Sequence, residues 1–187
     1  MFDYAAKFSS GLTYQEFLAQ HGTDEQRKRW NDWYPQVKLT DAQKSLLGSF
    51  KRKMPVVVLA GAWCGDCVQQ CPIFEHFAEA SSVLEFRYFD RDATPDLAAE
   101  LKICGGGRVP VVVFLSEDYQ QLGLLGDRTL SKYRQLAEQQ LGAQCPTGLG
   151  SANQELLTAV TQEWLNEFER CQLILRLSPR LRQLHGD

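Results

Sequence analysis

The chain has 187 residues, 44% of them apolar, and a formal net charge of −3. This composition is typical of an ordinary globular protein, and the negative charge argues against a nucleic-acid partner, which usually needs a basic surface. No apolar run approaches the ~20 residues of a membrane-spanning helix, and the N-terminus lacks the charged and apolar regions of a signal peptide. We therefore expect a cytoplasmic protein with no membrane partner.

Three threonine-led patterns predict helices in the first segment, residues 1–54. In a capping box, the threonine side chain binds the backbone three residues later, and a Glu or Gln at that position binds back. Apolar residues at helical spacing follow each pattern. Such stripes need a partner surface, so we expect this segment to be a helical extension that packs on the next one. The pairs are Thr13 with Glu16, Thr23 with Gln26, and Thr40 with Gln43.

Residues 55–141 change to alternating strands and helices. Val56–Ala60 is a continuous apolar run that starts with three valines, which is typical of a central strand buried on both faces. Thr94-Pro95-Asp96 combines a cap residue, a first-turn proline and an early acid, so it predicts a helix start. The expected strands are 56–60, 83–89, 111–115 and 119–125, and the expected helices are 65–80, 94–103 and 126–141. This βαβαββα order indicates an α/β fold.

The last segment, residues 142–187, begins with the linker-like stretch 142–150. Ser151 and Gln154 then repeat the capping pattern, and one long helix is expected over 152–177. It carries a single apolar stripe, and we expect that stripe to pack on the protein, because exposed apolar area is disfavoured by roughly 25 cal/mol per Å². Ser178-Pro179 is expected to end the helix, with a basic tail after it. The stripe is Leu157, Val160, Trp164, Phe168, Cys171 and Leu175.

The strongest chemical signal is Trp63-Cys64-Gly65-Asp66-Cys67, which lies between a predicted strand and a predicted helix. A sulfur at a helix N-terminus faces unpaired N–H groups and the helix dipole, which stabilise a thiolate. The second cysteine lies about one turn further on, where it can resolve a mixed disulfide. Gly65 leaves room for a substrate backbone. The motif therefore predicts thiol–disulfide exchange.

With these residues the sequence resembles the thioredoxin superfamily. Trp63 precedes the first cysteine, as in thioredoxins, and Pro72 follows Cys67 by five residues, where thioredoxins have a helix-kinking proline. Val109-Pro110 precedes the third strand, at the position of the family's cis-proline. The resemblance covers roughly residues 55–141. It implies a thioredoxin-like core with a central mixed four-stranded sheet, plus added N- and C-terminal helices.

The resemblance also implies roles for these residues. Cys64 is the expected nucleophile and Cys67 the resolving thiol. Pro110 is the expected cis-proline, and Val109 before it is expected to pair with the substrate backbone, while Trp63 shapes the docking surface. A proline at this position also disfavours metal capture by the dithiol. No metal and no cofactor are expected.

The sequence departs from the family pattern in two ways near the motif. Thioredoxins carry a buried carboxylate six residues before the first cysteine, and that position here is Val58. The base that would take the Cys67 proton is therefore missing from its usual place. Asp66 replaces the usual proline inside the motif, where it could relay protons or merely repel negative charge from Cys64. The N-terminal βα unit is also absent, as in the smaller glutaredoxin-type arrangement.

Four further cysteines have less distinctive positions. Cys71 extends the motif in a way that invites a metal-cluster interpretation, although a buried free thiol fits its position better. Cys104 precedes three glycines and is either a third redox thiol or a packed loop residue. Cys145 and Cys171 flank the linker and the last helix, and a disulfide between them is a weaker alternative to free thiols.

Two charged residues also have two interpretations. Arg108 is either a contact for an acidic substrate or a glutathione carboxylate, or an ordinary surface charge. Asp127 lies where glutaredoxins bind the γ-glutamyl end of glutathione, but it also suits a helix cap, which we favour. His21, His76 and His185 have no metal-ligand spacing.

The leading functional prediction is a thiol–disulfide oxidoreductase that reduces protein disulfides through Cys64 and Cys67. Its expected partners are disulfide-bearing proteins and a thiol or reductase that supplies electrons. One alternative is a glutathione-linked, glutaredoxin-like reductase. The other is an adaptor that uses its added helices to bind a partner and has little catalytic activity.

Overall fold

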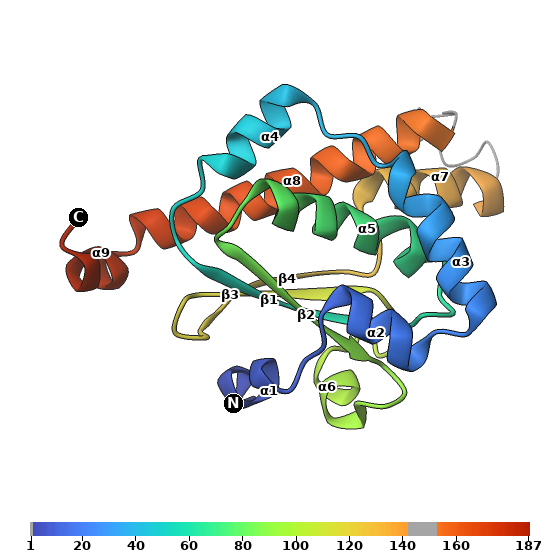
Figure 1. Cartoon of the computed structure of the whole chain (residues 1–187), viewed down its shortest axis with the longest axis horizontal. Helices are drawn as coiled ribbons and strands as arrows, with labels where there is room; N and C mark the ends of the chain where they lie inside the picture. The colour runs from blue at the N-terminus through green and yellow to red at the C-terminus, as the bar shows by residue number, and fades with distance from the viewer. Residues whose placement is uncertain (1, 142–152) are drawn as a thin grey trace.

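The computed structural model describes residues 2–141 and 153–187, and its centre is a four-stranded sheet (Figure 1). In the order β2-β1-β3-β4, β1 is parallel to β2 and antiparallel to β3, and β4 is antiparallel to β3. The strands are β1 (Met54–Ala60), β2 (Leu84–Asp90), β3 (Val111–Leu115) and β4 (Gln121–Gly126). This mixed sheet and the βαβαββα order confirm the fold class expected from the sequence.

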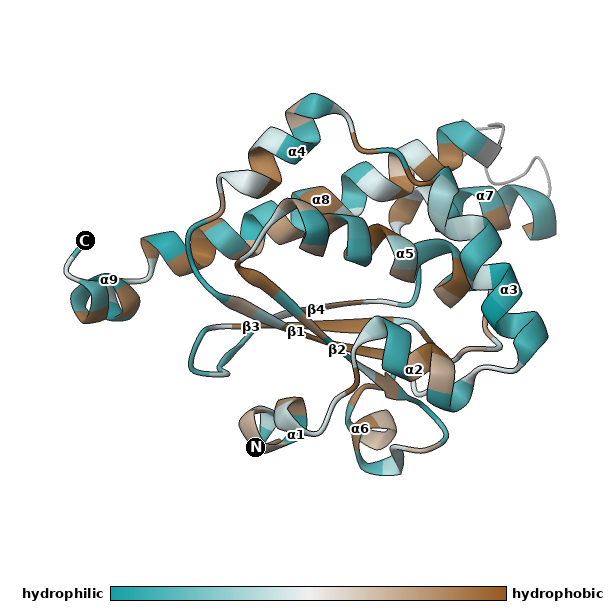
Figure 2. Cartoon of the chain, in the orientation of Figure 1, coloured by the Kyte–Doolittle hydropathy of each residue, from teal (hydrophilic) through white to brown (hydrophobic). Residues whose placement is uncertain are grey.

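Strand β1 is an inner strand of the sheet, and all seven of its residues are buried. Its register places Val57 between Arg87 of β2 and Val113 of β3. β-Branched side chains pack well on such a pleated surface. Figure 2 shows hydrophobic strands in the middle of the molecule and mostly hydrophilic outer helix surfaces. Because β1 is held on both sides, its end at Ala60 is a fixed starting point for the cysteine motif.

The N-terminal segment forms four α-helices and one short 3-10 helix. Both halves of the capping box are present at Thr13, Thr23 and Thr40, so these three predicted helix starts are confirmed. The first helix was not expected, because its cap Asp3 accepts from the Ala6 N–H (3.0 Å) with no reciprocal Glu or Gln. The helices are α1 (Tyr4–Ser9), α2 (Tyr14–His21), α3 (Asp24–Trp33), η1 (Tyr34–Gln36) and α4 (Asp41–Gly48).

A single residue of this segment pairs with the outer edge of the sheet. The Leu12 N–H donates to the Tyr88 carbonyl (3.0 Å), and the Tyr88 N–H donates to the Leu12 carbonyl (2.7 Å). The adjacent Gly11 allows this approach, since a Cβ there would lie 2.5 Å from the Cβ of Arg87. Exposed strand edges invite pairing with other chains. Leu12 therefore covers part of the edge that the absent first strand would occupy.

Three helices belong to the central segment: α5 (Gly65–Ala80), α6 (Pro95–Glu100) and α7 (Leu130–Leu141). The first matches its expected bounds, whereas α6 is shorter and α7 starts later than predicted. The expected side-chain cap at Thr94 is wrong: its hydroxyl donates instead to the Asp90 carbonyl. The Asp90 carboxylate accepts the N–H groups of Asp92 and Ala93 (2.9 and 3.0 Å), so the β2–α6 loop folds around Asp90.

The long C-terminal helix α8 (Asn153–Leu177) is present, and every residue of its predicted apolar stripe is buried. Trp164 packs edge-on against Phe74 of α5 (4.7 Å between ring centroids), and Phe168 packs against Phe114 of β3 (4.9 Å). The predicted basic tail is wrong in part, because Pro179–His185 forms a further helix, α9, capped by the Ser178 hydroxyl. The start of the long helix at Ser151, and the linker 142–150, lie outside the described residues.

Helices cover both faces of the sheet (Figure 1). The helices α5 and α8 lie side by side on one face, while α1 and α6 lie on the other and are joined by the Lys7–Asp96 ion pair (2.7 Å). Buried residues of both terminal segments belong to the same hydrophobic cluster as the strands. The division into three segments stays a prediction. Among the described helices, none is long and apolar enough to cross a membrane.

Candidate active site at the start of helix α5

The cysteine motif lies where β1 meets α5. A short loop follows Ala60, and Cys64 is the N-cap residue of α5 in an extended conformation. The Cys64 N–H donates to the Gly61 carbonyl (3.0 Å), and the Cys64 carbonyl accepts from the Val68 N–H (3.0 Å). The helix N-terminus therefore starts directly at Cys64, as the motif predicts.

The two sulfurs differ in access. Cys64 is 9% exposed, whereas Cys67, one turn into the helix, is completely buried. The Cys64 thiol lies 3.5 Å from the Val109 carbonyl, to which it donates. The Val109–Pro110 peptide bond is cis. The structure thus brings together the four predicted residues Cys64, Cys67, Val109 and Pro110, with Cys64 as the sulfur that a substrate can reach.

The pKa of each thiol in the motif is raised. For Cys64, the hydrogen bond with Cys67 and burial raise the pKa more than the N–H groups of Cys67 and Asp66 lower it. For Cys67, complete burial raises the pKa. Val58, at the usual carboxylate position, is fully buried among apolar side chains. The reduced pair therefore holds both protons near neutral pH, in contrast to the thiolate that the helix N-terminus alone predicts.

Trp63 forms an exposed surface beside Cys64. Its side chain is one of the few large apolar groups in contact with solvent, at 43% exposure. The Arg91 guanidinium lies over the ring, 4.5 Å from its centroid, and donates to the Gly107 carbonyl at 3.0 Å. A cation over an indole face is a favourable contact. Arg91 therefore joins Trp63 to the loop that precedes Val109.

Asp66 is held by an arginine. Its carboxylate pairs with Arg128 at 2.6 Å, and Arg128 also pairs with Asp127 at 2.8 Å. An ion-paired carboxylate must lose part of this interaction to accept a proton. Charge compensation of the motif is therefore the role that the contacts of Asp66 favour, and proton relay by Asp66 stays a prediction.

The preferred interpretation of Asp127 as a helix cap is wrong. Its carboxylate is buried and accepts from the side chains of Tyr133, Arg128 and, at 3.5 Å, Arg108. A cap would accept backbone N–H groups of α7 instead. The same carboxylate is the partner of Arg108, whose half-exposed side chain forms an ion pair with it.

A buried glutamine joins this group to the C-terminal helix. Gln70 of α5 donates to the Asp127 carbonyl (3.0 Å) and accepts from the Trp164 indole N–H (2.9 Å). Buried polar groups need such partners, because an unpaired one costs ~1–3 kcal/mol. Contacts thus run from Trp164 through Gln70, Asp127 and Arg128 to Asp66, so α8 supports the motif.

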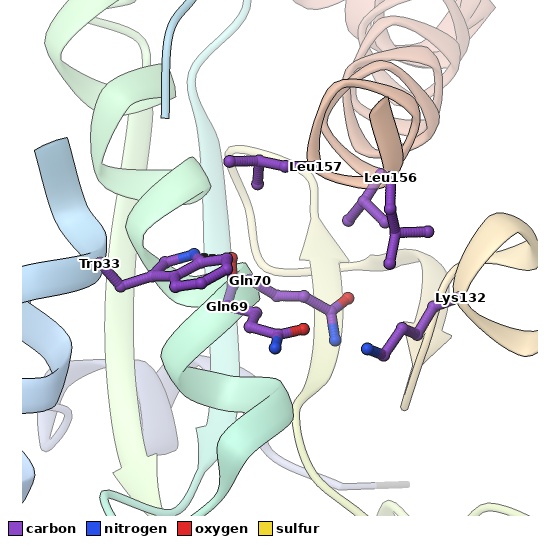
Figure 3. Close-up of a pocket in the computed structure, with 7 residues that line it drawn as sticks. Trp33, Gln69, Gln70, Lys132, Leu156 and Leu157 are labelled. Carbon is purple, nitrogen blue, oxygen red and sulfur yellow. Dashed lines mark hydrogen bonds between the residues drawn. The ribbon is translucent and has the colours of Figure 1, made fainter. Parts of the chain in front are cut away.

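A small pocket lies beside Gln70, between α3, α5, α7 and α8. Figure 3 shows Gln69 and Gln70 on α5 facing Lys132 of α7, with Leu156 and Leu157 of α8 above them. Trp33 closes one side, and its indole N–H donates to the Gln69 carbonyl at 3.1 Å. Neither sulfur of the motif lines the pocket. It is a packing gap between helices near the site.

The structure shows the environment of three of the four remaining cysteines, for which the sequence left alternatives open. Cys71 and Cys171 are buried free thiols, and Cys104 is an exposed one. Cys104 has a positive φ of 50° and forms a tight turn with Gly105, closed by hydrogen bonds between Ile103 and Gly106 (3.0 Å each). Cys145 lies outside the described residues. No group of three or more metal-binding side chains occurs in the described ranges.

Comparisons with known proteins identify the family. A family model described as thioredoxin matches residues 11–139. The chain belongs to the thioredoxin family. The match begins before α2, so α2–α4 are part of the family pattern, whereas the sequence motifs suggested a resemblance from residue 55 only. This thioredoxin-family fold supports a thiol redox function in general. A search of curated proteins found no match.

Two solved structures share the fold over nearly their whole length. A protein of unknown function from Pseudomonas aeruginosa has a TM-score of 0.66 at 18% identity, over 90% of this thioredoxin-family chain and 99% of its own. An HIV epitope scaffold has a TM-score of 0.63 at 18% identity, over 89% of this chain and 99% of its own. The alignments cover about nine-tenths of this chain, so the shared fold includes more residues than the 11–139 that the family model matches.

The sequence analysis missed several residues at the site. Arg128 and Gln70 belong to no sequence motif, since the contacts that place them at the site, with Asp66 and with Asp127 and Trp164, join residues distant in the sequence. Arg29 of α3 was also missed: its Nη2 lies 3.9 Å from where a Cβ on Gly65 would be. Glu75 had a usable signal, because it follows Cys67 by two steps of four residues and so lies on the same face of α5.

The raised pKa of Cys64 predicts the pH dependence of its alkylation. Only the thiolate reacts, so the rate at Cys64 should rise about tenfold per pH unit from pH 7 to pH 9, with no plateau. Iodoacetamide labelling with peptide mapping measures this rate separately from that of exposed Cys104. A plateau for Cys64 below pH 7 would mean that the helix N-terminus dominates after all.

Proposed function

We propose that this protein is a thiol–disulfide oxidoreductase that reduces disulfides in proteins. The observation that carries the proposal is the pairing of a reachable sulfur with a buried one at the start of α5. Cys64 keeps 9% of its surface exposed beside the Val109 carbonyl, and Cys67 lies fully buried one turn below it. A buried second thiol is protected from outside disulfides and reacts with Cys64 in preference to them.

The reaction proceeds in two exchanges. The Cys64 thiolate attacks one sulfur of the substrate disulfide, forms a mixed disulfide and releases the other substrate sulfur as a thiolate, which takes a proton. The Cys67 thiolate then attacks the Cys64 sulfur, forms the Cys64–Cys67 disulfide and releases the second substrate thiol. Two electrons pass from the dithiol to the substrate. A thiol or a reductase must return them.

The raised pKa values favour the reducing direction. Enzymes that stabilise a cysteine thiolate stabilise their reduced form and become oxidants. Here the hydrogen bond with Cys67 and burial raise the pKa of Cys64, so the thiolate gains little from the site. A pair without thiolate stabilisation gives up electrons more readily. This supports a reductase over an oxidase.

Arginine side chains around the motif favour an acidic substrate. Arg29 is exposed beside Gly65, and no ion pair with another described residue occupies it. Arg91 lies on Trp63, the exposed platform next to Cys64, but it already pairs with Asp92 at 2.8 Å, so Arg29 is the main contact that we propose for a substrate carboxylate. We expect the substrate chain to lie along Val109, with a carboxylate near its disulfide that reaches Arg29. A cytoplasmic location remains part of the proposal.

A glutathione-linked reductase is the second candidate. Arg108 is half-exposed near the dithiol loop and can offer a guanidinium to a glutathione carboxylate. Asp127 is less available, because two arginines and Tyr133 already occupy its buried carboxylate. This difference favours a protein substrate. An adaptor with little catalytic activity is the third possibility, and it predicts little or no disulfide reduction.

The direct test is insulin reduction with two electron donors, thioredoxin reductase with NADPH and glutathione with its reductase. We expect activity in the wild type, none in Cys64→Ser, and a trapped covalent complex with substrate in Cys67→Ser. Cys171→Ser, a buried cysteine away from the motif, is the matched control and should retain activity. Monothiol glutathione turnover in Cys67→Ser would support the glutathione-linked reductase, and an inert wild type would support the adaptor.

Removing Arg29 should weaken the reduction of acidic substrates. For a peptide disulfide flanked by glutamates, Arg29→Ala should raise KM about two- to fivefold, the equivalent of an exposed ion pair of ~0.5–1 kcal/mol. The adjacent Lys28→Ala is the matched control, because Lys28 pairs with Asp32 (2.5 Å) on the same helix. Equal KM values for acidic and neutral peptides in the wild type would contradict an acidic substrate.

A further inference from the structure

The buried face of α5 carries a line of ionisable side chains that the two-cysteine reaction does not use. Cys67, Cys71 and Glu75 follow one another at intervals of four residues. On an α-helix such residues lie one above the other on the same face. The line starts at the resolving thiol and runs away from the site into the protein.

The members of this line contact one another and a tyrosine of the sheet. Cys67 and Cys71 are both completely buried one turn apart on this face, and each affects the pKa of the other. Glu75 accepts a hydrogen bond from the Tyr88 hydroxyl of β2 at 2.8 Å. Glu75 and Cys71 interact electrostatically with each other and with Tyr88. Cys71 therefore stands between the resolving thiol and a carboxylate.

A second tyrosine faces the same group from the N-terminal segment. Tyr14 of α2 packs edge-on against Tyr88, 5.7 Å between ring centroids, and interacts electrostatically with Cys71 and Glu75. Its hydroxyl is buried, and no hydrogen bond to the described residues occupies it. Buried polar groups are rarely left unpaired. This hydroxyl is a further donor that can stabilise a charge on Glu75.

The charge state of Glu75 changes near neutral pH. Its pKa is raised to about 7 in total. Burial raises this pKa most, the hydrogen bond from Tyr88 lowers it, and the negative charge of Glu79 raises it. The other ionisable groups that face this part of α5 are Cys71, Tyr14 and Tyr34; Tyr34 and His76 bind Glu79. Glu75 is thus an anion above pH 7, where it can take a proton.

We propose that Glu75 is the proton acceptor for Cys67 and replaces, from the helix side, the carboxylate that is missing at Val58. This inference rests on the proposed function, because it concerns the second exchange of that reaction. Glu75 acts through Cys71 and touches neither sulfur of the disulfide. A purely structural role as partner of Tyr88 would be filled equally well by a glutamine.

In this step the proton of Cys67 is relayed along the line by two proton transfers. In the mixed disulfide, the Cys67 thiol passes its proton to the Cys71 sulfur while the Cys71 proton moves to the Glu75 carboxylate. The Cys67 thiolate attacks the Cys64 sulfur, the Cys64–Cys67 bond forms, and the bond from Cys64 to the substrate breaks. The substrate sulfur leaves as a thiolate and takes a proton from solvent. Glu75 is only partly buried, so its proton can then return to solvent.

Stopped-flow reaction with Ellman's reagent separates the two exchanges. Reaction of Cys64 releases the first thionitrobenzoate, and attack by Cys67 on the mixed disulfide releases the second. A background of Cys104→Ser and Cys145→Ser removes an exposed thiol and one outside the described residues. In the wild type the second rate should fall as the pH drops below about 7, because Glu75 becomes protonated and stops accepting.

Glu75→Gln should leave the first rate unchanged and slow the second by about 10²-fold, the lower range for a positioned proton-transfer group. In the wild type the second rate should level off above about pH 7, whereas in Glu75→Gln it should keep rising with pH, because it then follows the thiolate fraction of Cys67, whose pKa is raised. Glu100→Gln, the same chemical change on exposed α6, is the matched control. Circular dichroism and the melting temperature verify that each variant is folded.

Cys71 variants give a second test that keeps Glu75 and Tyr88 intact. Cys71→Ser retains a group that can pass a proton and should keep most of the second rate, whereas Cys71→Ala should slow it as Glu75→Gln does. A second rate and pH profile unchanged in folded Glu75→Gln, with a normal first rate, would overturn this proposal alone. Absence of the first reaction at Cys64 in the wild type would overturn the proposed function itself.

Discussion

The constraint on which the site depends is the complete burial of Cys67 directly beneath Cys64. Burial protects the resolving thiol from outside disulfides, and it also makes its ionisation costly. Several groups around the motif interact with its cysteines or compensate its charge. The start of α5 offers N–H groups to Cys64, the Val109 carbonyl accepts a hydrogen bond from the Cys64 thiol, and Arg128 compensates the charge of Asp66. The line of Cys71 and Glu75 on the buried face of α5 is the route that we propose for the proton of Cys67.

The terminal helices are parts of this arrangement. The indole N–H of Trp164 in α8 donates to Gln70, and Gln70 donates to the Asp127 carbonyl. Arg128, which pairs with Asp66, also pairs with the carboxylate of Asp127. On the other side, α2 places Tyr14 against Tyr88. The family model matches from residue 11 to residue 139, so it includes α2 but not α8. Loss of either terminal region would therefore disturb the site as well as the core.

Most of the fold was predictable because it depends on local patterns. Three capping boxes, a run of valines and a stripe on α8 each specify an element from adjacent residues. The helix α9 was missed since Ser178-Pro179 both ends one helix and starts another. At the site, the motif predicted the two cysteines, and the resemblance to thioredoxins implied the cis-proline at Pro110. The bonds of Arg128, Gln70 and Asp127 depend on tertiary packing, so no sequence pattern announced them. Burial, equally invisible in the motif, raises the pKa of Cys67.

A map of the cysteines after one round of reaction shows directly whether Cys64 and Cys67 form the redox pair. The fully reduced protein is mixed with an equal amount of a protein disulfide, quenched in acid and digested for peptide mapping. The account predicts one new disulfide, between Cys64 and Cys67, with Cys71 and Cys171 still thiols. An oxidised Cys104 or Cys71 with Cys64 and Cys67 left as thiols would contradict it.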